Sequence, residues 1–289
     1  MVKFQYISDI HLEHHKNNNV FFKIKKIPGC ENICILGDIG YPESQIYKDF
    51  MTYCSNTWKN VFWIMGNHEF YNKPKTEIMV MAEIEEYVKQ ICPKNVYYMN
   101  NTVLYLDKIT NEISSSIKNN EKTLKIIGST LWTNINDSTA EHLNDYKKIY
   151  SENVENNFGI NMYRKLKPQI TRKIFQTAKL FILENINNTI NPITGISIEN
   201  IECLILTHHG IHPLCQGNYI DNPLESGYAT EIVEIFESKN VVAAICGHIH
   251  SNINIKVADV KLLSNCYGYI GENQNIVKFN PKAVLEIIN

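Results

Sequence analysis

An α/β fold is predicted from two features of the sequence. Short apolar segments typical of strands alternate with longer segments of helical periodicity, and polar motifs follow several strands directly. The 289 residues, 44% of them hydrophobic, suffice for one large domain or two small ones. Strands are expected where apolar or β-branched residues cluster, at 4–7, 33–36, 61–65, 103–106, 124–127, 204–206, 242–246, 253–257 and 260–263.

Helices are expected between these strands. Residues 42–58 open with a proline, which suits the first turn of a helix. Residues 74–92 carry apolar side chains at helical spacing, and residues 226–238 form another candidate. In residues 168–186 the apolar positions form one stripe, which indicates packing against the core and not a partner-binding face.

Two polar stretches interrupt this alternation. Residues 107–122 are expected to form a protruding hairpin loop, and residues 187–200 a connection to the next strand. Neither has the low complexity of a linker between domains.

Composition excludes several classes of protein. The net charge of −2 and the pI of about 6.6 provide no general basic field, which argues against nucleic acid as a partner. No apolar run approaches the roughly 18 residues of a membrane span. The N-terminal segment reads as a strand that leads into a motif, not as a signal peptide. The eight cysteines form no Cys-x-x-Cys pair, so we expect reduced thiols and a cytoplasmic location.

Five short motifs carry the side chains that bind metals, and each follows an apolar run directly. They are Asp9-Ile10-His11, Gly37-Asp38, Gly66-Asn67-His68-Glu69, Thr207-His208-His209 and Gly247-His248-Ile249-His250. Divalent transition metals accept imidazole nitrogen and carboxylate oxygen. In extended backbone, residues i and i+2 point the same way, and the carboxyl ends of strands form the usual site of an α/β sheet. The sequence therefore predicts a metal site at one edge of the sheet.

The order of these motifs resembles that of the calcineurin-like metallophosphoesterases. The resemblance covers almost the whole chain and is nearest to a branch that carries Ser-Asp-x-His-Leu-Glu, found here as Ser8-Asp9-Ile10-His11-Leu12-Glu13. It implies one domain over residues 1–289, folded as a four-layer α/β/β/α sandwich with the metals at one rim. Residues 134–183 would be an insertion that forms a helical cap over this rim.

The resemblance also implies two divalent metal ions. Manganese is the first choice, and iron, zinc, nickel or magnesium are the alternatives. Asp38 would bridge the two ions. The first ion would take Asp9, His11 and His250, and the second would take Asn67, His208 and His248.

Further residues near the motifs are candidates for catalysis and substrate binding. In the family the residue at the position of His68 points at the substrate, so His68 is the expected catalytic residue that assists the leaving oxygen. Glu69 could orient it or cap the next helix. Resemblance makes Tyr71 and Asp145 candidate substrate contacts. Several other histidines lie close to ligands and are either substrate contacts or ordinary loop residues: His14, His15, His209 and His212.

The implied reaction is hydrolysis of a phosphoester by a hydroxide that bridges the two metals. We expect a phosphodiester of small or nucleotide-like character as the substrate. A phosphomonoesterase and a nuclease with the same site are alternatives. A different class, a non-catalytic scaffold that keeps the metallophosphoesterase fold, would be expected to have lost some motif residues, whereas every motif is present here.

Overall fold

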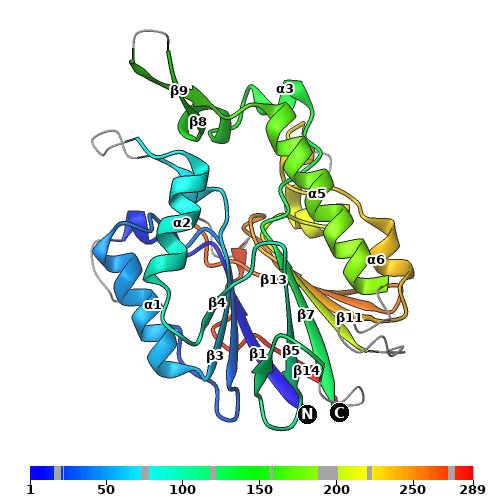
Figure 1. Cartoon of the computed structure of the whole chain (residues 1–289). Coiled ribbons are helices and arrows are strands. Elements are labelled where there is room, and N and C mark those ends of the chain that lie inside the picture. Colours follow the sequence, from blue (N-terminus) through cyan, green and yellow to red (C-terminus); the bar gives the residue numbers. More distant parts are fainter. Residues whose placement is uncertain are drawn as a thin grey trace.

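Two facing β-sheets form the centre of the molecule (Figure 1). The computed structural model describes residues 1–15, 21, 23–72, 78–117, 122–156, 159–187, 201–219, 223–272 and 277–288. The first sheet has the order β14-β1-β2-β3-β4. Its strands are β1 (Val2–Ile7), β2 (Asn32–Leu36), β3 (Asn60–Ile64), β4 (Val96–Tyr98) and β14 (Val284–Ile287). The strands β1 to β4 are parallel, and β14 pairs antiparallel to β1.

The second sheet has the order β12-β13-β11-β10-β7-β5-β6. Its strands are β5 (Thr102–Asp107), β6 (Ile113–Ser114), β7 (Thr123–Ser129), β10 (Cys203–Thr207), β11 (Val241–Cys246), β12 (Asn252–Val257) and β13 (Val260–Asn265). Its centre, from β13 to β7, is parallel, and antiparallel strands lie at both sides.

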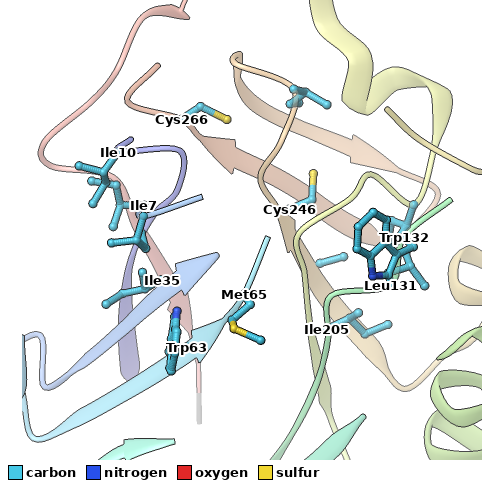
Figure 2. Packing of buried hydrophobic residues seen from close by; sticks show 14 of the residues in the cluster. Ile7, Ile10, Ile35, Trp63, Met65, Leu131, Trp132, Ile205, Cys246 and Cys266 are labelled. Carbon is cyan, nitrogen blue, oxygen red and sulfur yellow. The ribbon is translucent and has the colours of Figure 1, made fainter. Parts of the chain in front are cut away.

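Successive side chains of a buried strand point to opposite faces of its sheet, so one face packs against helices and the other against the second sheet. Ile33 and Ile35 of β2 pack in a cluster with side chains of the helix α1 (Gln45–Thr57), whereas Cys34 and Leu36 join a second cluster that draws on both sheets. The helices α1 and α2 (Met81–Ile91) lie on the outer side of the first sheet, and α5 (Pro168–Asn187) and α6 (Val233–Glu237) on that of the second (Figure 1). Figure 2 shows the helix-facing cluster at both sheets. The predicted α/β/β/α sandwich is confirmed.

The segment 134–183 differs in content from the expected helical cap. It begins with two one-turn helices, α3 (Asp137–Ala140) and α4 (Asp145–Lys148). An antiparallel hairpin of β8 (Tyr150–Glu155) and β9 (Asn161–Lys165) follows and projects from the molecule near α2 (Figure 1). The long helix α5 packs on β7 in the outer layer.

Three predicted helices are shorter than expected. The helix predicted at 42–58 is observed as Gln45–Thr57 with Ser44 as its N-cap, so Pro42 precedes the helix and does not lie in its first turn. Residues 78–80 are not helical, and α2 begins at Met81, where the Val80 N–H donates to Glu83 Oε2 (2.9 Å). Residues 73–77 lie outside the described residues. The predicted helix 226–238 is wrong for its first half, which holds only a short 3-10 turn at Glu225–Gly227 before an irregular stretch. The carbonyl of Gly227, the last residue of this turn, contacts the candidate ligand His248.

The polar stretches and several short strands differ from the expectation. The polar stretch 107–122 contains the added strand β6 within the β5-to-β7 hairpin, and residues 118–121 lie outside the described residues. Of the connection 187–200, only its first residue is described. The strands β4, β6, β8, β9 and β14 were not predicted. All eight cysteines are free thiols. None of the described helices is long and apolar enough to cross a membrane.

Candidate metal centre

The five motifs meet at one rim of the sandwich, in loops that follow β1, β2, β3, β10 and β11. Backbone hydrogen bonds connect these loops. The N–H of Asp9 donates to the Gly37 carbonyl (2.9 Å), and that of Gly247 donates to the His208 carbonyl (2.9 Å). The second of these bonds joins neighbouring loops of the second sheet, and the first joins neighbouring loops of the first. The motif residues are therefore held by a connected set of loops and not by isolated turns.

Several candidate ligands lie in left-handed backbone conformation. The φ angles are 54° at Asp9, 52° at His11, 52° at Asp38, 70° at His248 and 41° at His250. Left-handed backbone costs a residue with a Cβ roughly 1–2 kcal/mol, so it persists only where the surroundings impose it. Such strain is concentrated at functional sites, and its effect here is to turn the side chains toward one point.

The motif glycines provide the space that the ligands need. A Cβ on Gly66 would collide with Asp38 Oδ1 and the His208 ring, and one on Gly37 would lie 2.5 Å from His208 Nδ1. A Cβ on Gly247 would lie 2.7 Å from the Leu36 carbonyl oxygen. The Gly-Asp, Gly-Asn-His and Gly-His pairings thus have a packing cause.

The first ligand group contains Asp9, His11 and His250, whose candidate atoms lie within 4.8 Å of one another. His11 Nδ1 lies 3.2 Å from Glu13 Oε1, and His250 Nδ1 lies 2.7 Å from Glu272 Oε2. With these nitrogens donating to carboxylates, the two Nε2 atoms face each other at 3.0 Å. Two lone pairs at this distance repel each other unless a proton or a metal ion lies between them.

The second group contains hydrogen-bond acceptors turned toward one another. His208 Nδ1 donates to the Leu36 carbonyl (2.7 Å), so its Nε2 carries a lone pair. That atom lies 3.1 Å from Asn67 Oδ1 and 3.5 Å from Asp38 Oδ1. The orientation of the Asn67 amide is fixed, because its nitrogen donates to Asp145 Oδ1 (2.8 Å). The backbone N–H of His68 also donates to Asp38 Oδ1 (2.8 Å). Three acceptors turned toward one another in this way are the surroundings of a bound cation.

His248 and Asp38 complete this arrangement. The Nε2 of His248 donates to the Gly227 carbonyl oxygen (3.2 Å), which leaves Nδ1 to face Asp38 and His208. Asp38 also forms a cluster with His11 of the first group and with His68. Asp38 therefore lies between the two groups, in the position that a bridging carboxylate needs.

The ionisation of the buried groups fits a site for positive charge. Burial is the largest influence on the Asp9 pKa and raises it, but His250 and the other histidines outweigh burial and hold that pKa well below its usual range. Burial, followed by the charges of Glu69 and Asp9, holds the pKa of Asp38 well above its usual range. The negative charges of Asp9 and Asp38 repel each other, so ionisation of one disfavours ionisation of the other.

Burial lowers the pKa of two candidate ligand histidines, whereas hydrogen bonds raise the pKa of a third. Burial lowers the pKa of His208 to about 3 and that of His11 to about 4, so both are neutral and able to bind a metal. Burial also lowers the pKa of His250, but its hydrogen bonds to Asp9 and Glu272 outweigh this and raise it to about 9.

His68 points into the space beside both groups. Its Nδ1 lies 2.8 Å from Glu13 Oε1. Its Nε2 lies 3.2 Å from the Tyr269 hydroxyl and 3.9 Å from Asp38 Oδ2. Glu69 does not contact this ring through an observed hydrogen bond among the described residues, because its carboxylate accepts from the backbone N–H groups of residues 38, 39 and 66. Glu69 therefore holds the ligand loops together.

A pocket of about 240 Å³ opens beside these residues. Its wall consists of Asp38, Asn67, His68, Tyr71, Leu143, Asn144, Asp145, Tyr228, His248, Ile249, His250, Tyr269 and Glu272. The candidates Tyr71 and Asp145 line this pocket. His209 does not, because it is buried behind His248, where it contacts the Thr130 carbonyl and stacks on Trp132. His212 lies outside the pocket and packs against Phe236.

His14 and His15 are also not among the residues that form the wall of the pocket. The side chain of His14 is half exposed and packs edge-on against Tyr269. His15 contacts the Ile10 carbonyl oxygen. Sequence reasoning assigned no role to Glu13, Tyr269 or Glu272. Glu13 belongs to the Ser-Asp-x-His-Leu-Glu motif that carries the family resemblance, whereas no pattern in the sequence indicates Glu272.

The chain is similar to several known proteins. The sequence matches the calcineurin-like phosphoesterase family over residues 2–252. An uncharacterized protein of Acanthamoeba polyphaga mimivirus is 29% identical over 308 residues, covering 98% of this chain and 96% of its own. The phosphopantetheinyl hydrolase of Mycobacterium tuberculosis has a similar structure, with a TM-score of 0.64 at 13% identity, over 92% of this chain and 89% of that one.

A further solved structure is more distant. The putative 5'-nucleotidase of Staphylococcus aureus, solved in complex with α-ketoglutarate, gives a TM-score of 0.47 at 13% identity and covers 93% of this chain and 48% of that one. The family match extends over most of the chain and includes all five motifs. The chain therefore belongs to the calcineurin-like phosphoesterase family.

Proposed function

We propose that this chain is a phosphoester hydrolase that binds two divalent metal ions and cleaves a small phosphodiester. The observation that carries the proposal is that His208 Nε2, Asn67 Oδ1 and Asp38 Oδ1 are acceptors turned toward one another, although the Asp38 oxygen also accepts from the His68 N–H (2.8 Å). In this assignment Asp38 bridges the ions. Asp9, His11 and His250 hold the first, and Asn67, His208 and His248 hold the second.

Bound there, two ions would activate a water molecule and neutralise the charge that develops on the phosphoryl group. The chain itself supplies the remaining chemistry. His68 is the proposed proton donor to the leaving oxygen, since its Nδ1 is held by Glu13 and its Nε2 faces the pocket. A positioned acid contributes a factor of about 10²–10⁴ to the rate.

The charge of the pocket favours a diester. Among the described residues that line it there is no lysine or arginine, and it includes the carboxylates of Asp38, Asp145 and Glu272. A monoester carries close to two negative charges at neutral pH, whereas a diester carries one. These acids offset much of the positive charge of the two metal ions, so a phosphate group with one negative charge suits the pocket better than one with two. The small pocket and the net charge of −2 also favour a small substrate over a long nucleic acid.

We further propose manganese as the metal and the cytoplasm as the location. The mixed imidazole, carboxylate and amide set suits manganese, and iron, zinc or nickel would also accept it. Eight free cysteines fit a reducing compartment. The direct test is hydrolysis of an aryl diester and an aryl monoester by the Mn²⁺-loaded protein. Near-stoichiometric binding of two ions without hydrolysis of either ester would favour the non-catalytic scaffold.

His68→Asn tests the assigned acid. The variant should retain both ions, and its rate on a diester with an alkyl leaving group should fall by about 10²–10⁴-fold. The loss should be smaller on a p-nitrophenyl diester, because that leaving group carries negative charge without help. Equal losses on the two esters together with loss of an ion would make His68 a metal ligand instead.

A further inference from the structure

One buried carboxylate contacts both a candidate metal ligand and the proposed acid. Glu13 Oε1 lies 3.2 Å from His11 Nδ1 and 2.8 Å from His68 Nδ1. The exposed imidazole of His14 is the next neighbour, at 3.8 Å. Glu13 lies in the short 3-10 helix Leu12–His14, directly after the first ligand motif, and its side chain is 3% exposed.

The surroundings of Glu13 show that its position has an energetic cost. The second oxygen, Oε2, is buried and has no hydrogen-bond partner among the described residues. It lies beside Gly40, where an added Cβ would approach it to 3.0 Å, so the missing side chain at Gly40 makes room for it. A buried carboxylate is expensive unless hydrogen bonds and opposite charge compensate it. The two imidazole rings supply that compensation.

The hydrogen bonds fix which nitrogen of each ring faces inward. Glu13 Oε1 accepts from His11 Nδ1 and from His68 Nδ1. As a result, each ring turns its other nitrogen, Nε2, toward the site.

We propose that Glu13 is a positioning residue shared by metal binding and proton donation, an inference that rests on the proposed function. Through His11 it orients the lone pair that binds the first metal. Through His68 it orients the Nε2 proton. During hydrolysis the attacking water releases one proton to the solvent and its oxygen forms a bond to phosphorus, the bond from phosphorus to the leaving oxygen breaks, and the Nε2 proton moves to that oxygen. The neutral ring regains a proton from the solvent.

Glu272 provides the matched control. Its Oε2 lies 2.7 Å from His250 Nδ1, so it orients a ligand of the same first metal. Glu272 makes no observed hydrogen bond to His68 among the described residues, where its further partner is the Tyr269 N–H (2.8 Å). Glu13→Gln and Glu272→Gln should therefore both weaken metal binding, by about 10–100-fold, the usual effect of losing a partner of a ligating histidine. The leaving-group effect should appear only in Glu13→Gln.

The experiment measures three quantities for the full chain. Calorimetric titration of the metal-free protein with Mn²⁺ gives the metal affinity. At saturating Mn²⁺, kcat/KM for an alkyl diester divided by that for a p-nitrophenyl diester gives the leaving-group dependence. In Zn²⁺-loaded protein with ¹⁵N-labelled histidine, NMR reports which ring nitrogens carry protons. Glu13→Asp is included as the conservative variant, and thermal melting of each variant verifies that it is folded.

We expect Glu13→Gln to lower the kcat/KM ratio by roughly tenfold or more and Glu272→Gln to leave it within about twofold, following the size of acid catalysis. Adding Glu13→Gln to His68→Asn should not lower the ratio again, and Glu13→Asp should restore part of it. An unchanged ratio, or an equal fall in Glu272→Gln, would overturn the shared role.

The proposed function can fail separately. If the wild-type protein hydrolyses neither ester, the hydrolase assignment is wrong, and the positioning role of Glu13 is then decided by metal affinity and NMR. Loss of the Nδ1 proton signals of both rings in Glu13→Gln, with weaker metal binding, would support it. Retention of both signals and of full affinity would refute it. If Glu13→Gln does not fold, Glu13→Asp decides the same questions.

Discussion

The orientation of Asn67 depends on a residue far away in the sequence, and this gives a quantitative prediction. Asp145 Oδ1 accepts hydrogen bonds from the Asn67 amide nitrogen (2.8 Å) and from the Tyr71 hydroxyl (2.6 Å). Asp145 is 4% exposed. In Asp145→Ala the Asn67 nitrogen would retain only the longer contact to the Tyr71 hydroxyl, at 3.2 Å. The amide could then turn and present its nitrogen, instead of its oxygen, to the metal.

The expected magnitude follows from these contacts. A hydrogen bond to a charged group contributes about 1.5–3 kcal/mol, and losing a residue that orients a ligand costs about 10–100-fold in metal affinity. We therefore expect Asp145→Ala to weaken binding of one ion by about 10–100-fold, or about 1.4–2.7 kcal/mol. Tyr71→Phe removes the other donor to Asp145 and leaves the Asn67–Asp145 bond intact, so its effect on affinity should be several-fold smaller.

The assay is Mn²⁺ titration of metal-free wild-type protein and both variants, followed by kcat and KM at saturating Mn²⁺. Thermal melting verifies that each variant is folded. Full metal affinity in Asp145→Ala with a raised KM would refute the positioning argument. It would instead support the expectation from the family resemblance that Asp145 contacts substrate.

Three further predictions concern the metals. Asp38→Asn keeps the shape but removes the charge between the two groups, so it should lose at least one ion and nearly all turnover; full turnover with both ions bound would exclude a bridging role. Gly66→Ala should weaken metal binding, because its Cβ would meet Asp38 and His208. The control Gly128→Ala meets Met99 in the core and should lower the unfolding free energy by about 1–3 kcal/mol without changing metal affinity. Chelation should lower the melting temperature, since each site held at 100 times its Kd adds about 2.7 kcal/mol of stability; an unchanged melting temperature would contradict metal binding to the native state.

Strong local periodicity explains which elements were predictable. The expected helix 168–186 is observed as Pro168–Asn187, and the expected strands 33–36 and 61–65 are observed as Asn32–Leu36 and Asn60–Ile64. These elements bury a continuous apolar stripe or run. The hairpin of β8 and β9 buries little, and its residues show no apolar alternation. Its pairing depends on its own backbone and on contacts with α2 and α4, which local sequence does not report.

Tertiary contacts override periodicity in the segment 226–238. Its apolar residues have helical spacing, yet Gly227 packs so closely against Leu143 that an added Cβ would lie 2.7 Å from that side chain. The Gly210 N–H donates to the Tyr228 carbonyl, and the Gly227 carbonyl accepts from His248. A regular helix would use these carbonyls for its own hydrogen bonds. These carbonyls are used instead by Gly210 and by the candidate ligand His248.

The same distinction separates the ligands from the residues that orient them. Ligand spacing is local, since Asp9 and His11, or His248 and His250, are two residues apart in the sequence. The expectation that extended backbone would pair them is wrong, because all four residues have left-handed backbone, and His248 and His250 belong to different groups. The orienting groups come from distant and irregular segments, such as Glu272 for His250. Sequence shows which atoms can bind a metal, and only the folded chain shows which lone pairs face inward.

Backbone hydrogen bonds and the Glu69 carboxylate hold the strained backbone of the rim in place. Left-handed conformations at Asp9, His11 and Asp38 would each be unfavourable in an isolated loop. They are compensated because the N–H of His11 donates to the Asp38 carbonyl (3.0 Å) and the Glu69 carboxylate accepts from the Asp38 N–H (3.0 Å). Buried Glu69 therefore stabilises loop geometry that no ligand alone could impose. Glu69 thus contributes by preorganising the site. Because the loops are already held in their strained conformation, little conformational entropy would be lost when a metal ion binds.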